Sequence, residues 1–231
     1  MYPVGFVIML NESLRQQYLW TTSLYLFVQA ICSAIFLFEA SGNKKSLPVV
    51  ILIFIVSIII ETIGVITGFP FGNYMYTDTL QPILFSTVPM AIGFAWVTLS
   101  VNSFLCVRYF LGENKNTLVV LLSGAFIALI DVILEPFASF INKYWLWENG
   151  DIPFQNYLSW FIIGILFSYI LNKITGRFKI NVFFPIAVLV LMVLQFLVIN
   201  LVNNYLLISL TGIIGIVLIT SSLIYLRKNE E

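Results

Sequence analysis

The sequence contains no histidine and few charged residues, and both absences restrict what the protein can do. None of the 231 residues is His. This excludes histidine-rich di-iron sites, a histidine general base and the usual catalytic zinc sites. Charged residues make up only 10% of the chain, against about 25% in soluble domains. Too little polar surface is present to cover a water-soluble globule.

The chain also lacks a net charge, a cysteine pattern and a signal-peptide pattern. The net charge is zero, so nothing indicates nucleic acid or an acidic partner. The two cysteines, Cys32 and Cys106, lie inside apolar runs, which disfavours a disulfide framework. The apolar segment Met1–Leu10 lacks a preceding basic region and an A-x-A-like site, so we expect no cleavable signal peptide.

Long apolar runs dominate what remains. Hydrophobic residues make up 60% of the chain, and the mean hydropathy is +1.00. Lipid permits only helices or closed barrels to cross it, and continuous rather than alternating runs favour helices. We therefore predict an all-α, polytopic transmembrane bundle that forms one domain, residues 1–231. The expected spans are Tyr18–Phe38, Leu47–Ile66, Pro82–Cys106, Thr117–Phe140, Gln155–Asn172, Asn181–Ile199 and Tyr205–Leu226. Six spans remain an alternative, because a tight turn joins the last two.

The basic residues fall unevenly on the two sides of these spans. On one side lie Lys44, Lys45, Arg108, Lys115, Lys173, Arg177, Lys179, Arg227 and Lys228. On the other side lie Arg15 and Lys143. Because basic loops stay in the cytoplasm, we expect the N-terminus outside and the C-terminus inside a bacterial or archaeal cytoplasmic membrane.

Three acidic residues, Glu61, Asp131 and Glu135, lie within expected spans at a similar depth in the outer half. A charge at the centre of a membrane helix costs roughly 2.5–3.5 kcal/mol, so such residues indicate function by default. Asp131 and Glu135 are four residues apart and share a helix face. Both cannot ionise cheaply in an apolar interior, so at least one is expected to hold its proton. We predict that they form an acid–base pair and that Glu61 positions water or shares the proton. The alternative is that all three are structural groups that tie helices together.

The loops on the outer side supply further candidates. Each loop follows a helix that carries an intramembrane acid, and each is rich in aromatic residues and Asn. As substrate-binding residues we select Asn73, Tyr74, Tyr76 and Asn156 at the pocket mouth, together with Asp78 and, within or at the start of spans, Trp96 and Trp160. An interfacial aromatic belt, helix packing and turn formation are the competing interpretations of these side chains.

Several of these segments together resemble one known family. They are Glu61-Thr62-Ile63-Gly64 with Gly68-Phe69-Pro70-Phe71-Gly72-Asn73-Tyr74-Met75-Tyr76, Val88-Pro89 with Trp96, Asp131-x-x-x-Glu135-Pro136, Trp145-x-Trp147-x-x-Gly150, and Pro153 with Asn156 to Trp160. In these residues the chain resembles the carotenoid biosynthesis membrane family, which includes CruF-type carotenoid 1′,2′-hydratases and bisanhydrobacterioruberin hydratases. The resemblance covers roughly residues 61–160.

This resemblance implies that water adds across the terminal double bond of an acyclic carotenoid end group to give a tertiary alcohol. The carboxyl cluster suits that reaction, because protonating such an alkene produces a tertiary carbocation that water captures. The reaction needs no metal or cofactor. The expected partners are a lipophilic carotenoid, membrane lipid and other enzymes of the carotenoid pathway.

Two other functions fit the same residues. A lycopene-cyclase-like enzyme would form the same cation but let an internal double bond capture it. A proton-coupled transporter or sensor would use the carboxyl groups as a relay.

Overall fold

The computed structural model describes residues 7–8, 10–42, 44–112, 114–174 and 182–228. Within these residues, seven helical segments are long and apolar enough to span a membrane. They are α3 Thr21–Ser41, α4 Ser46–Thr67, α5 Met90–Leu111, α6 Asn116–Glu135 with its π-helical continuation η1 Pro136–Ile141, α7 Phe154–Ile174, α8 Phe183–Val202 and α9 Leu206–Lys228. A short helix, α2 Glu12–Tyr18, precedes them. The predicted all-α bundle with seven spans is confirmed.

Some predictions fall on residues outside the described ranges. These are Asn181, the expected start of the sixth span, the basic residues Arg177 and Lys179, residues 1–6 and 9 of the segment Met1–Leu10, and the residues after Lys228.

The start of the third span was predicted wrongly. The expected span began at Pro82, but α5 begins at Met90. The intervening residues form a hairpin of β2 Ile83–Leu84 and β3 Val88–Pro89. Pro89 caps α5 in an extended conformation. Proline disfavours a helical conformation in the residue before it. The helix therefore starts only after Pro89, although the hydrophobic run begins at Pro82.

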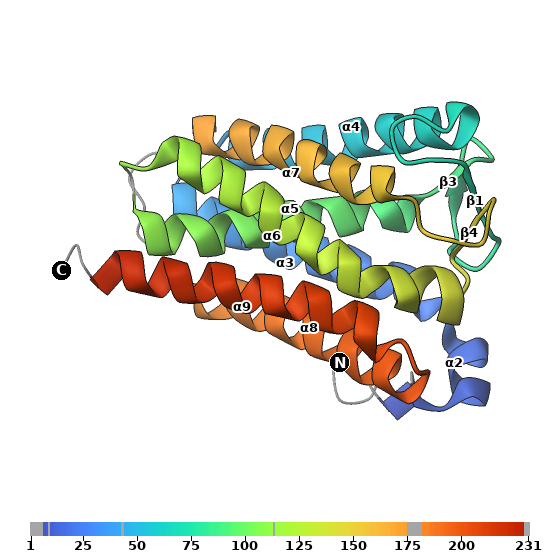
Figure 1. Cartoon of the computed structure of the whole chain (residues 1–231). Coiled ribbons are helices and arrows are strands. Elements are labelled where there is room, and N and C mark those ends of the chain that lie inside the picture. The colour runs from blue at the N-terminus through green and yellow to red at the C-terminus, as the bar shows by residue number, and fades with distance from the viewer. Residues whose placement is uncertain (1–6, 9, 43, 113, 175–181, 229–231) are drawn as a thin grey trace.

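The helices run alternately up and down along one axis (Figure 1), and α5 is the most buried of them. A polar side chain on α5 bonds both to a neighbouring helix and within α5 itself. Asn102 Nδ2 donates to Ser33 Oγ on α3 at 2.8 Å and to the carbonyl of Thr98 at 2.8 Å. Side-chain bonds of this kind hold membrane helices together where the hydrophobic effect does not.

Glycines bring α6 and α7 into close contact. A Cβ atom at Gly124 would lie 2.9 Å from the carbonyl oxygen of Phe161, and one at Gly164 would lie 3.0 Å from Gly124 Cα. Small residues at such crossings let two helix backbones approach. This contact fixes the position of α7 along α6, and both helices contribute to the site described below.

A small antiparallel ladder closes one end of the bundle (Figure 1). β1 Tyr74–Tyr76 pairs with β4 Trp145–Trp147, so that Tyr74 faces Trp147 and Tyr76 faces Trp145. The chain reaches β1 through Gly68, which ends α4 with φ +74°. A left-handed conformation of this kind favours glycine. The ladder thereby joins two segments that are about 70 residues apart in sequence, at this end of the helix bundle.

The acidic helix α6 changes geometry at Pro136. Residues Pro136–Ile141 form a π-helix, in which Asn142 N–H donates to the carbonyl of Phe137. Nearby, the carbonyl of Ile133 accepts a side-chain bond of 2.8 Å from Asn200 on α8. This bond joins α6 to α8 about one turn before the π-helix begins.

Candidate active site

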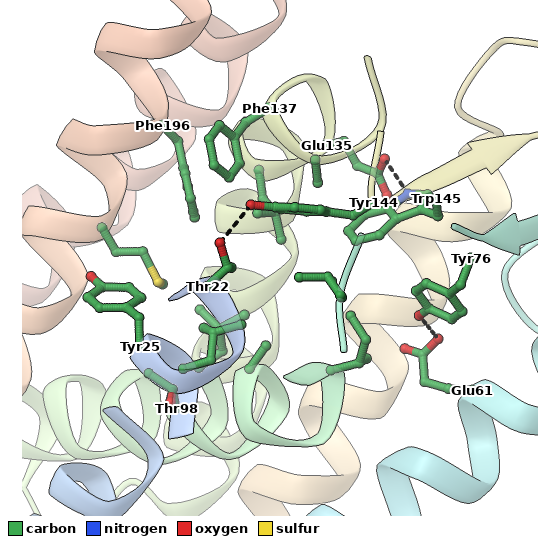
Figure 2. Close-up of a pocket in the computed structure, with 18 of the residues that line it drawn as sticks. Thr22, Tyr25, Glu61, Tyr76, Thr98, Glu135, Phe137, Tyr144, Trp145 and Phe196 are labelled. Carbon is green, nitrogen blue, oxygen red and sulfur yellow. Dashed lines mark hydrogen bonds between the residues drawn. The ribbon is translucent and has the colours of Figure 1, made fainter. Parts of the chain in front are cut away.

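A cavity of about 510 Å³ lies beneath the β1–β4 ladder, among α3, α4, α5, α6, α7 and α8. Most of its wall is aliphatic or aromatic. The exceptions include two carboxyl groups, Glu61 and Glu135. They approach the cavity from different helices, with Tyr76, Tyr144 and Trp145 around them (Figure 2). A largely apolar pocket with a few polar groups is the usual form of a small-molecule site, and its volume falls within the usual range of roughly 300–1,000 Å³.

Glu61, on α4, is 3% exposed and accepts three hydrogen bonds. Its Oε2 accepts from Tyr74 at 2.6 Å and from Tyr76 at 2.7 Å, and its Oε1 accepts from Trp96 Nε1 at 2.9 Å. An ionised carboxylate offers about four acceptor positions. Three protein donors therefore leave room for about one more donor, such as a water molecule.

Asn156 on α7 joins the other two carboxyl groups. Its Nδ2 donates to Asp131 Oδ2 at 2.8 Å and to Glu135 Oε1 at 2.9 Å. The remaining oxygen of Glu135, Oε2, accepts from the indoles of Trp147 at 3.1 Å and Trp145 at 3.3 Å. Asp131 Oδ1 is buried and has no hydrogen-bond partner in the part of the chain that the structure describes. The Asn156 amide thus bridges Asp131 and Glu135, and among the described residues nothing donates to Asp131 Oδ1.

The β1–β4 ladder supplies two aromatic donors to each cavity carboxyl. Tyr74 and Tyr76 of β1 bond to Glu61, while Trp145 and Trp147 of β4 bond to Glu135. Side chains at alternate positions of a strand share a face, so each aromatic-x-aromatic strand points two rings inward. Burial and the negative charge of Glu61 raise the pKa of Tyr74 and Tyr76, which keeps both hydroxyls protonated as donors.

Two stacked tryptophans support this arrangement from α5 and α7. The rings of Trp96 and Trp160 lie 4.1 Å apart, centroid to centroid, at an interplanar angle of 18°. Trp160 lines the cavity, while Trp96 lies behind it and bonds to Glu61. A flat indole at the wall offers the electron-rich face that attracts cations.

A polar cluster lies at another part of the cavity wall, where Thr22 bonds to Tyr144 (Figure 2). The Tyr144 hydroxyl lies 3.1 Å from Thr22 Oγ1 and accepts from Asn142 Nδ2 at 3.0 Å. Burial raises the pKa of Tyr144 to about 12, although these bonds and the charge of Arg15 oppose the shift. Tyr144 therefore stays neutral near pH 7.

The predicted site residues divide into three groups. Glu61, Glu135, Tyr74, Tyr76, Asn156 and Trp160 line the cavity. Asp131 and Trp96 lie behind the cavity wall. Asp131 accepts a hydrogen bond from Asn156 and Trp96 donates one to Glu61, and both of these partners line the cavity. Asn73 and Asp78 are exposed and do not reach the cavity; Asn73 instead bonds to Glu148 at 2.6 Å.

Several lining residues were not predicted as site residues. Trp145 and Trp147 bond to Glu135, and their aromatic-x-aromatic spacing matches that of Tyr74 and Tyr76, which was an available signal. The cavity also includes residues of α3 and α8, among them Thr22, Tyr25, Met192, Gln195 and Phe196. Their spans are uniformly apolar in sequence, so no motif marked these residues as part of a site. Among the described residues, no group of three or more His, Cys, Asp and Glu side chains could hold a metal ion.

Comparison with known proteins places this site in a family. A family model described as "Carotenoid biosynthesis protein" matches residues 21–219, which include all seven helices that could span a membrane, the last of them in part. The chain belongs to this carotenoid biosynthesis family. The three carboxyl groups, the β1–β4 ladder and every residue that lines the cavity except Ile8 lie inside the matched range, so the site belongs to the part of the chain that matches the family.

One curated relative matches part of the chain. Bisanhydrobacterioruberin hydratase from Haloarcula japonica is 36% identical over 110 residues. The aligned stretch covers 46% of this carotenoid biosynthesis protein and only 37% of the relative's length. No solved structure matches the chain.

Proposed function

We propose that this protein is a carotenoid hydratase that adds water across the terminal double bond of an acyclic end group. The observation that carries the proposal is that two buried carboxyl groups, Glu61 and Glu135, face one aromatic, largely apolar cavity. Family membership and the hydratase name of the Haloarcula japonica relative support it. The reaction matches the site because it requires an acid, a base, a water-poor pocket and protection of a cation.

The Asp131–Glu135 pair supplies the proton in this mechanism. Two negative charges one helical turn apart in an apolar interior repel, so the pair holds a proton between them. Asp131 Oδ1, which has no donor among the described residues, is a natural place for that proton at rest. Glu135 contacts the cavity and delivers it. The carboxyl O–H bond breaks as a C–H bond forms at the less substituted alkene carbon, and the positive charge appears on the tertiary carbon.

The aromatic wall then stabilises the cation. Tyr74, Tyr76, Trp145, Trp147 and Trp160 all line the cavity. A cation close to such a ring face gains about 0.5–2 kcal/mol, the larger values applying where water is excluded. The hydroxyls of Tyr74 and Tyr76 and the indole N–H groups of Trp145 and Trp147 donate to carboxyl oxygens, so the faces of these rings remain available to the cation.

Glu61 guides the water that completes the reaction. Its three donors leave about one acceptor position, which a water molecule can occupy with its oxygen toward the cation. The water oxygen forms the C–O bond, and one of its protons passes to a carboxylate. One proton is consumed and one is returned, so the net change is the addition of one water molecule.

The substrate approaches from the lipid. Leu24 of α3 lines the cavity and is 48% exposed on the outside of the bundle. This exposure supports an opening of the cavity toward the lipid beside α3. Only the reacting end group needs to lie beside the carboxyls, while the polyene extends toward the membrane through this side.

Expression in a bacterial host that accumulates lycopene or γ-carotene tests the proposal. The pigments are separated by chromatography and weighed by mass spectrometry, with the protein quantified in the membrane fraction. A new pigment heavier by one water is the expected result. A pigment of unchanged mass that absorbs at shorter wavelength would identify a cyclase. Unchanged pigment beside abundant protein would exclude both substrates, and the assay would then be repeated in a host that makes longer acyclic carotenoids.

A further inference from the structure

A second pocket lies directly outside the active-site cavity. It has a volume of about 430 Å³ and is lined by Thr67, Gly68, Phe69, Gly72, Asn73, Trp147, Asn149, Asp151, Pro153 and Gln155. We call it the outer vestibule. Its polar members Thr67, Asn73, Asn149, Asp151 and Gln155 are all exposed, so it is open to solvent. It lies in the loops that follow α4 and α6, at the end of the bundle that carries the β1–β4 ladder.

Among the described residues, Trp147 is the single side chain that lines both the cavity and the outer vestibule. It is 8% exposed, and its indole Nε1 donates to Glu135 Oε2 at 3.1 Å on the cavity side. On the vestibule side its ring lies against Gly72, where an added Cβ would be 3.5 Å from Trp147 Cζ3. One indole thus lies between an exposed, polar pocket and the buried Glu135 carboxyl.

The rim of the vestibule is fixed on both sides of this indole. Asn73 Nδ2 donates to Glu148 Oε2 at 2.6 Å, and the backbone N–H of Glu148 donates to the carbonyl of Asn73 at 3.0 Å. Gly72 lies so close to Pro153 that a Cβ atom would be 2.6 Å from the proline ring. With the rim held in this way, rotation of the Trp147 side chain is the smallest change that would connect the two spaces.

We infer that Trp147 is a water gate, which admits water from the outer vestibule to Glu135 and Glu61. The inference rests on the proposed hydration, because that reaction consumes one water per product in a pocket that must otherwise stay dry. The fate of the cation depends on the same route. Water that passes Trp147 gives the alcohol, whereas a cation that meets no water loses a proton or is captured by an internal double bond.

Thiol labelling tests the gate without any catalytic assay. The two native cysteines are replaced (Cys32→Ala, Cys106→Ala), and Leu80→Cys places one thiol in the cavity wall, where Leu80 is 1% exposed. A small water-soluble thiol reagent is then added. We expect Trp147→Ala to raise the labelling rate about tenfold, equivalent to lowering the barrier by about 1.4 kcal/mol.

Trp145→Ala is the matched control for this experiment. Trp145 also lines the cavity and donates to the same Glu135 oxygen, but it does not line the outer vestibule. Its loss should leave the labelling rate near that of the parent. Equal acceleration by both substitutions would mean general loosening and would overturn the gate, as would no acceleration by Trp147→Ala.

A second variant leaves the indole in place and fills the vestibule instead. Asn149→Trp adds bulk at an exposed position of the vestibule, while Met75→Trp adds the same bulk at an exposed position of β1 outside it. We expect Asn149→Trp to slow formation of the hydrated pigment about tenfold and to raise the share of unhydrated products, with Met75→Trp unchanged. A parental rate in Asn149→Trp would overturn the gate. If no variant or parent hydrates any carotenoid, the proposed function fails, while the labelling result still decides the gate.

Discussion

At the residue scale, the three carboxyl groups differ in how their oxygens are occupied. Glu61 has three protein donors, Glu135 has three, and Asp131 has one, from Asn156. A buried acid with few donors is better suited to hold a proton, and one with many is better suited to hold a charge. This difference marks Asp131 as the proton store. Glu61 and Glu135 have equal numbers of donors, and their roles in the proposed mechanism follow instead from Glu135 being paired with Asp131 through Asn156, whereas Glu61 is not.

The first prediction concerns the donor. Glu135→Gln keeps the size and the acceptor oxygen that faces Asn156 but cannot give a proton, so hydration should fall by about 10²–10⁴-fold. Pigment analysis together with the amount of protein in the membrane measures this. Glu39→Gln, at an exposed acid on α3, is the control and should retain activity. Full activity in Glu135→Gln would remove Glu135 from the mechanism.

The second prediction concerns the donors to Glu61. Tyr76→Phe removes a 2.7 Å hydrogen bond to a carboxyl that is 3% exposed. Losing a bond to a buried charged group costs about 1.5–3 kcal/mol, so the detergent-solubilised protein should unfold at a lower temperature. Tyr225→Phe removes a hydroxyl from a side chain that is 67% exposed and should not change the unfolding temperature. Identical unfolding of the two variants would mean that the Tyr76 bond contributes nothing.

How far the sequence predicts the site depends on the kind of signal each residue carries. A carboxyl in an apolar span is conspicuous, and all three such residues meet around one site. Asn156 was expected at the mouth of the pocket, yet it lies 2% exposed between Asp131 and Glu135. Its role depends on the position of α7 along α6, which is set by contacts between distant segments. Asn73 has similar chemistry but lies on the exposed rim.

At the element scale, the close α6–α7 contact holds the acidic pair and Asn156 together. The third prediction is that Gly124→Val disrupts this alignment. A Cβ atom there would already lie 2.7 Å from Ile165 Cγ1 and 2.9 Å from the Phe161 carbonyl oxygen. Overpacking of this kind costs about 1–3 kcal/mol, so both stability and hydration should fall.

Leu166→Phe is the control for this prediction, because it adds bulk on the same helix, α7, at a position 43% exposed on the outside of the bundle. Thermal unfolding and pigment analysis of both variants provide the comparison. Parental stability in Gly124→Val would show that the two helices can separate without cost and that the contact does not set the geometry.

Element boundaries were predictable where hydropathy and backbone chemistry change together, and less so elsewhere. α4 and α7 begin and end within two residues of expectation. The third span was misplaced because the apolar run Pro82–Pro89 continues into α5, although it forms a hairpin. The β1–β4 ladder was not predicted, because each strand has only three residues and pairs with a segment about 70 positions away. No local periodicity can reveal such a pairing.

At the scale of the whole molecule, the alternation of the helices places the cavity and the outer vestibule toward one end of the bundle. Of the described basic residues, Lys44, Lys45, Arg108, Lys115 and Lys173 lie at or beside the opposite end. The positive-inside rule then predicts that the vestibule faces outward and the C-terminus faces the cytoplasm.

The fourth prediction tests this orientation. In a chain without Cys32 and Cys106, Met75→Cys places a thiol at a side chain that is 63% exposed in β1. A membrane-impermeant maleimide added to intact cells should label it. Lys115→Cys, at the opposite end before α6, should react only after the cells are opened. The reverse pattern would invert the proposed topology and place the vestibule on the cytoplasmic side.

The central claim is that buried carboxyl groups protonate a carotenoid double bond and that water captures the resulting cation. The most direct measurement supplies the purified protein and an acyclic carotenoid in deuterium oxide that also carries heavy oxygen, followed by mass spectrometry and NMR of the product. The mechanism predicts a tertiary alcohol with heavy oxygen in its hydroxyl and deuterium on the adjacent carbon, and no such product from Glu135→Gln. Turnover that leaves the pigment without heavy oxygen would contradict hydration. An alcohol without deuterium on the adjacent carbon would contradict protonation as its first step.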